Sequence, residues 1–159
     1  MTIESGMLLR LQFLSRVVRK ECKHLATTNQ RLFEGFFTLE HVARLEEDAD
    51  LAERVEAFVG RFARLQDTLG DKLLPLLLNA LGERSSAAID NLDLAERLGL
   101  INSSDNWMTM RQLRNQMVHE YVEDPVILSS ALQTGHEFVP ELLIAANKMI
   151  AELEQRGWA

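Results

Sequence analysis

Apolar residues recur at steps of three and four along most of the chain, which is the spacing of amphipathic helices. The clearest example follows an N-cap expected at Asp48 or Asp50. Its apolar stripe consists of Leu51, Val55, Phe58, Phe62, Leu65 and Leu69. The alternation at a step of two that is typical of strands is nearly absent. The pattern therefore predicts an all-α fold.

Glycine and proline residues indicate where the predicted helices end or bend. Gly70 and Pro75 are expected to end or kink the helix that carries this stripe, and an apolar segment continues to about Leu81. Gly135 and Pro140 are expected to bend or split the last helix. That last helix is predicted over 124–154, and the remaining helices span approximately 8–27, 39–47, 87–98 and 106–122. Thr38 is expected to cap the helix over 39–47, and Gly99 to end the helix over 87–98.

These elements predict a single-domain helical bundle over 1–159, with five or six helices and an up-and-down four-helix-bundle core. The connections between them are short, and no Pro- or Gly-rich segment is long enough to be a linker between domains. A chain of 159 residues is also the size of one ordinary domain.

The composition and the charge limit the classes of protein to which the chain can belong. Hydrophobic residues make up 47% of the chain and charged residues 26%, as in a globular protein. The single cysteine, Cys22, permits no intramolecular disulfide, and Cys22 with His24 is too small a set for a zinc site. No signal peptide is visible, and the most apolar stretch, 73–81, is too short to cross a bilayer. We expect a cytoplasmic protein with no membrane association, no metal ion and no cofactor.

The net charge of −7 does not favour nucleic acid, but the charge is unevenly distributed. Residues 1–37 hold six Lys and Arg against three acids, and residues 38–60 hold seven acids against two bases. In the first predicted helix the apolar positions are Leu9, Phe13, Val17 and Leu25. Its basic face consists of Arg16, Arg19, Lys20 and Lys23. That face is a weak candidate for binding an RNA backbone, and a solvated surface is the alternative.

An arginine stands in the middle of the apolar face predicted for the helix over 106–122. That face consists of Trp107, Met110, Leu113, Met117, Val118 and Tyr121. Arg114 falls between these residues and cannot lose its charge, so its burial requires an acceptor. One alternative is an ion pair with a carboxylate from another helix. The other is a cleft in which Arg114 binds an anion such as phosphate.

His119, Asn115 and Arg111 lie one turn apart on the flank of the same helix, and Arg111 is a weak candidate for an RNA contact. An arginine and a histidine suffice for RNA cleavage without a metal ion, because His transfers the proton and Arg stabilises the phosphoryl charge. Arg114 and His119 are separated by about 140° around the helix axis. A site that uses both residues is therefore predicted to form between two such helices in a C2 homodimer.

The segment Arg114-Asn115, three residues, His119, one residue, Tyr121 resembles the signature of the HEPN superfamily, and specifically of HepT-type toxins. The residue-level match is confined to about 95–125. The resemblance implies a metal-independent endoribonuclease in which Arg114, Asn115 and His119 line a cleft at a homodimer interface. The spacing of Arg114 and His119 alone is not specific, because Arg19 and His24 share it.

The resemblance also implies partners. HepT-like toxins are neutralised by a minimal nucleotidyltransferase antitoxin, which can transfer AMP to the tyrosine of the His-x-Tyr element, here Tyr121. Two alternatives remain open. The chain could be a non-catalytic substrate- or nucleotide-binding subunit of a two-component nucleotidyltransferase. It could also be a structural helical dimer with Arg114 in a buried ion pair and Tyr121 in its core or interface.

Overall fold

The computed structural model describes residues 3–35, 37–84, 86–119 and 123–159, so Tyr121 lies outside the described residues. Within these ranges no strand occurs. The helical segments are α1 (Ser5–Leu32), α2 (Leu39–Ala43), α3 (Ala49–Asp67), the π-helical segment η1 (Thr68–Leu73), α4 (Leu74–Ala80), α5 (Ala88–Arg97), α6 (Ser104–His119) and α7 (Pro125–Gln155). Because α3, η1 and α4 follow one another without a break, the described residues form six helices.

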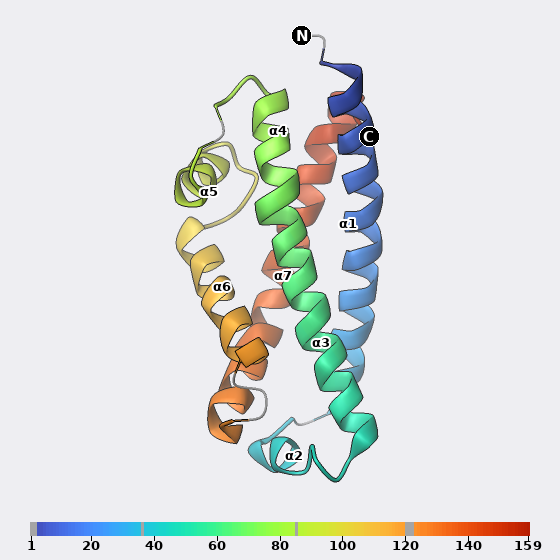
Figure 1. The fold of residues 1–159 in the computed structure, drawn as a ribbon, viewed down its shortest axis with the longest axis vertical. Helices are drawn as coiled ribbons and strands as arrows, with labels where there is room; N and C mark the ends of the chain where they lie inside the picture. Colours follow the sequence, from blue (N-terminus) through green and yellow to red (C-terminus); the bar gives the residue numbers. More distant parts are fainter. Residues whose placement is uncertain (1–2, 36, 85, 120–122) are drawn as a thin grey trace.

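Four long elements build an up-and-down bundle (Figure 1). α1 runs down the view, α3 with η1 and α4 runs up, α6 runs down and α7 returns to the top. The short α2 lies at the lower end and α5 at the upper end. This arrangement confirms the predicted all-α helical bundle. In the described ranges, no helix combines the length and apolar character needed to cross a membrane.

The core is formed by the inward faces of the four long elements. The stripe predicted for the third helix is confirmed, since Val55, Phe58, Phe62, Leu65 and Leu69 are fully buried and Leu51 is partly buried against the core. Burial of a large apolar side chain contributes about 1.5–3 kcal/mol, so this stripe alone holds α3 firmly against its neighbours.

The predicted N-caps are confirmed. The Asp48 carboxylate accepts a hydrogen bond from the Leu51 N–H at 3.0 Å and so begins α3. Thr38 begins α2, where His41 Nδ1 accepts from the Thr38 N–H at 3.0 Å. α2 is shorter than predicted and ends at Ala43.

The expectation that Gly70 or Pro75 ends the third helix is wrong. The helix continues through η1 to Ala80, and Pro75 lies directly after this π-helical segment. Gly70 has a packing role instead. A Cβ at this position would lie 3.2 Å from the indole nitrogen of Trp107, so the missing side chain lets α6 approach η1 closely.

Of the two outcomes expected for the last helix, a bend or a split, the split is wrong. α7 is one helix from Pro125 to Gln155 with Pro140 inside it. Val139 and Leu142 beside the proline are buried, and their packing offsets the lost backbone hydrogen bond.

The apolar face assigned to the first helix needs correction. Leu9 is 66% exposed and Phe13 is 44% exposed, whereas Leu11, Leu14 and Val18 are buried. The helix also extends at both ends, from Ser5 to Leu32. The sequence pattern misassigned the face because the exposed side of α1 carries apolar residues among its basic ones.

Candidate functional site

α6 carries the residues predicted to act on a substrate. Ser103 caps the helix, since its hydroxyl accepts from the Asn106 N–H at 3.1 Å. Trp107, Met110, Leu113 and Met117 are buried and fix the helix against α3 and α7. The surface of α6 that these anchors leave uncovered therefore has a fixed orientation.

Arg114 lies at the margin of the buried face and not in its middle. Its side chain is 32% exposed, and Val118, which was assigned to the apolar face, is 45% exposed. Nη2 of Arg114 donates to Oδ2 of Asp67 at 2.8 Å, and Nη1 donates to Oδ1 of Asn115 at 3.1 Å. The Nε atom is buried and has no hydrogen-bond partner. The ion pair with a carboxylate from another helix, one of the two alternatives for Arg114, is thus present.

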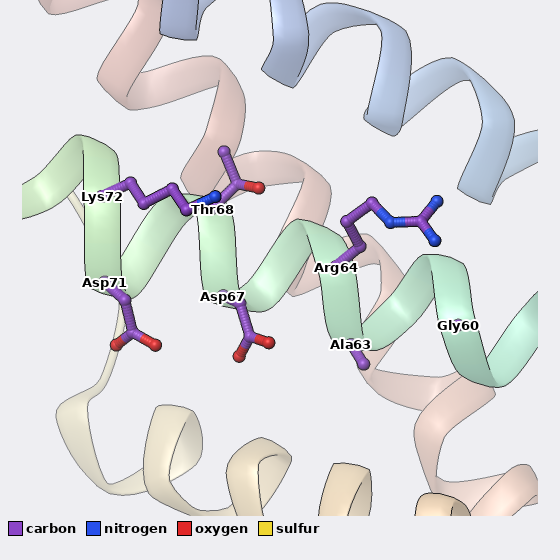
Figure 2. Close-up of a pocket in the computed structure, with 7 residues that line it drawn as sticks. All are labelled: Gly60, Ala63, Arg64, Asp67, Thr68, Asp71 and Lys72. Atoms are coloured by element: carbon purple, nitrogen blue, oxygen red, sulfur yellow. The ribbon is translucent and has the colours of Figure 1, made fainter.

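A second, looser ion pair lies one turn away. Nη2 of Arg111 is 3.7 Å from Oδ1 of Asp71, and both side chains are more exposed than those of the first pair. Figure 2 shows Asp67 and Asp71 pointing to the same side of their helix, toward α6, while Arg64 extends on the side of α1 and Lys72 runs along the helix toward Thr68. The facing surfaces of α6 and the α3–η1 helix therefore carry opposite charges.

Two hollows border this charged contact. The larger, of about 470 Å³, is the one drawn in Figure 2 and is lined by Gly60, Ala63, Arg64, Asp67, Thr68, Asp71 and Lys72. The smaller, of about 260 Å³, is lined by Glu56, Val59, Gly60, Met117 and Val118. Both include Gly60 of α3. Arg114 lines neither hollow, but it contacts Asp67, which lines the larger one.

His119 is exposed at the end of α6, and no hydrogen bond or ion pair joins it to another residue in the described part of the chain. The structure brings Asn115 against Arg114 but does not bring His119 against either of them. Within a single chain, Arg114 and His119 therefore remain apart, as their predicted positions around the helix axis imply.

The basic face of α1 is exposed, as predicted, but it belongs to a different surface. Arg16, Arg19, Lys20 and Lys23 are all solvent-exposed, and Arg19 forms an ion pair with Glu154 of α7. α1 packs on α3 and α7, and α3 lies between α1 and α6 in Figure 1. The structure therefore does not bring these four residues next to Arg114.

Three acidic residues near the site were not singled out in the sequence. Besides Asp67 and Asp71, Glu21 of α1 contacts η1, where the Thr68 hydroxyl donates to its Oε1 at 3.1 Å. Burial raises the pKa of Glu21 above its ordinary value, and nearby Arg64 and Lys72 oppose that shift. These contacts join residues about 47 positions apart, so no local spacing could have indicated them.

In the described ranges, no group of three or more His, Cys, Asp and Glu side chains is arranged to hold a metal ion. Comparison with models of protein families, with curated proteins and with solved structures gives no match to this chain. An assignment of function therefore depends on the chemistry of α6 and its surroundings, and on the motif that the sequence carries.

Proposed function

We propose that this chain is a HepT-like member of the HEPN superfamily, a metal-independent endoribonuclease that acts as a homodimer. The observation that carries the proposal is the Arg114–Asn115 hydrogen bond on α6, with a solvent-accessible His119 on the same helix. Together with Tyr121, these are the residues on which the motif resemblance rests.

The chemistry follows from the groups themselves. His119 accepts the proton of a ribose 2′-hydroxyl as the 2′-oxygen attacks the adjacent phosphorus. The bond from phosphorus to the 5′-oxygen breaks, and that oxygen leaves with a proton from solvent or from a second histidine. Arg114, held by Asn115, stabilises the negative charge that builds on the phosphoryl oxygens. The products are a 2′,3′-cyclic phosphate and a 5′-hydroxyl.

The geometry of one helix supports the dimeric form of the proposal. Side chains about 140° apart on a helix aim poorly at one phosphate group. A two-fold axis that sets α6 against α6 of a second copy brings Arg114 of one protomer toward His119 of the other. We also propose a nucleotidyltransferase antitoxin as the partner, a cytoplasmic location, and Tyr121, outside the described residues, as the acceptor of AMP. A bulky anionic group beside His119 would block the phosphate site.

One observation favours the alternative of a non-catalytic subunit or a structural dimer. Arg114 already has a carboxylate partner within its own chain, so its charge is satisfied without a substrate. Arg111, which the sequence offers as a weak RNA contact, is likewise paired, with Asp71.

The test is RNA cleavage by purified protein in EDTA. Arg114→Ala and His119→Ala are each expected to abolish cleavage, and Asn115→Ala to weaken it. Arg19→Ala and His24→Ala are matched controls, because these residues have the same spacing on α1, and both are expected to cleave like the wild type. A 2′-deoxy substitution at the cleaved position is expected to block the reaction. A wild type that is unmodified at Tyr121, folded and unable to cleave RNA would contradict the proposal.

A further inference from the structure

The guanidinium of Arg114 has no edge free for an anion in this structure. Arginine binds a phosphate most tightly through two parallel N–H groups on one edge. A phosphate cannot reach the edge that includes Nε, because the Nε atom is buried. The edge formed by Nη1 and Nη2 is engaged by Asn115 and Asp67 at 3.1 and 2.8 Å. Arg114 can therefore take a phosphate in this way only if one of these acceptors leaves.

Asp67 is the acceptor that can leave. In the described part of the chain its carboxylate has no hydrogen bond or ion pair other than the one to Arg114. The two side chains are 32% and 38% exposed, so water screens the attraction between them and can solvate the freed carboxylate. Asn115 is the nearest neighbour of Arg114 on the same helix, and its neutral amide does not repel an incoming phosphate.

We propose that Asp67 is a further residue of the site, which sets the affinity of Arg114 for phosphate groups by occupying the position that a phosphate oxygen takes. This inference rests on the proposed function only in assigning Arg114 to anion binding. A phosphate monoester or diester displaces the carboxylate, which then swings into the hollow that Asp67 lines on the outer side of α3. Without a bound phosphate, Asp67 neutralises the charge of Arg114. An RNA phosphate must therefore displace the Asp67 carboxylate in order to bind Arg114.

Asp71 provides the matched control. It lies one turn from Asp67, points to the same side of the helix in Figure 2, and carries the same charge. Its partner is Arg111 at 3.7 Å, beyond hydrogen-bond distance. A general loss of negative charge on this surface would affect both aspartates alike, whereas competition for Arg114 involves Asp67 alone.

The experiment is a titration with inorganic phosphate, followed by the NMR signal of the Arg114 Nε–H, which is assigned by its loss in Arg114→Lys. Asp67→Asn is expected to bind phosphate about threefold to tenfold more tightly than the wild type, as expected when a like charge about 5 Å away is removed from a partly solvated site. Asp67→Glu is expected to resemble the wild type, and Asp71→Asn to change affinity by less than about twofold.

The outcomes separate this inference from the proposed function. Unchanged or weaker phosphate binding in a folded Asp67→Asn protein would overturn it, and so would an equal gain in Asp71→Asn. A gain that persists in Asp67→Asn combined with Arg114→Ala would also overturn it, because the affinity would then belong to another site. Binding to this variant, which lacks the Arg114 Nε–H, is measured by isothermal titration calorimetry. Tighter phosphate binding by Asp67→Asn, with no RNA cleavage by any variant, would support the role of Asp67 and reject the ribonuclease.

Discussion

At the scale of single residues, Cys22 has a clear chemical consequence. Burial raises the pKa of its thiol to about 11 from an ordinary value of 9.0, with the neighbouring Glu21 contributing to the rise. At pH 8 the thiolate fraction is therefore about a hundredfold below that of an ordinary cysteine. We expect iodoacetamide to modify Cys22 far more slowly in the native protein than in urea. Equal rates in the two states would contradict the assigned environment.

The buried carboxyl of Glu21 is expected to make the free energy of unfolding depend on pH. Because burial raises its pKa in the folded state, the folded state binds the proton more tightly than the unfolded state. The resulting stabilisation is complete below the ordinary value of 4.5 and is lost as the pH rises through the higher folded pKa. We expect Glu21→Gln, which retains an acceptor for the Thr68 hydroxyl, to be more stable than the wild type at pH 7 and about equal at pH 4.

Urea unfolding midpoints at the two pH values measure this effect. Charged groups that face Glu21 are Arg64, Lys72 and Asp67. If the attraction of Arg64 and Lys72 outweighed the cost of burial and the repulsion by Asp67, Glu21→Gln would be less stable than the wild type at pH 7, which would reverse the predicted sign.

The position of Arg114 shows what a helical pattern could predict about one side chain. The pattern placed Arg114 in the middle of an apolar face, whereas the structure places it at the margin of the buried face. It overestimated the burial because it counted Val118 as part of that face, and Val118 is exposed. The partner of Arg114 was unpredictable, since Asp67 is 47 residues away and is one of 24 acidic residues in the chain.

At the scale of elements, two glycines of the α3–η1 helix should respond oppositely to alanine. A Cβ at Gly60 would meet no atom within 4 Å, so Gly60→Ala is expected to stabilise the helix by roughly 0.5–1 kcal/mol. A Cβ at Gly70 would lie 3.2 Å from the indole nitrogen of Trp107, whose side chain is buried and has little room to move. Gly70→Ala is expected to destabilise the protein by roughly 1–2 kcal/mol.

Thermal or urea unfolding of Gly60→Ala, Gly70→Ala and the wild type measures both changes in stability. Stabilisation by both substitutions would mean that Trp107 adjusts freely and that α6 is not held closely against η1.

The helix ends that carry a capping residue were predictable from the sequence. The continuation of a helix through a proline was not. Three residues mark helix ends because each supplies a hydrogen-bond acceptor or a left-handed backbone. They are Asp48, Thr38 and Gly99, and Gly99 has a φ of +77°. Pro75 and Pro140 remain inside continuous helices because packing on both sides outweighs the local cost. Such packing depends on distant residues, which the local pattern does not include.

At the scale of the whole molecule, the bundle topology was predictable because short connections force successive helices to run antiparallel. The described chain places Arg114 and Asn115 in contact on α6 and leaves His119 apart from them. The proposal combines the arginine of one copy with the histidine of another, so a composite dimer site is its central claim.

Mixing two inactive variants tests that claim most directly. Arg114→Ala and His119→Ala proteins, each inactive alone in EDTA, are combined under conditions that allow subunit exchange, and RNA cleavage is measured. Each mixed dimer has one site with both residues intact, so the mixture is expected to recover about a quarter of wild-type activity. A mixture that stays inactive, although exchange is verified and the wild type cleaves RNA, would contradict the composite site.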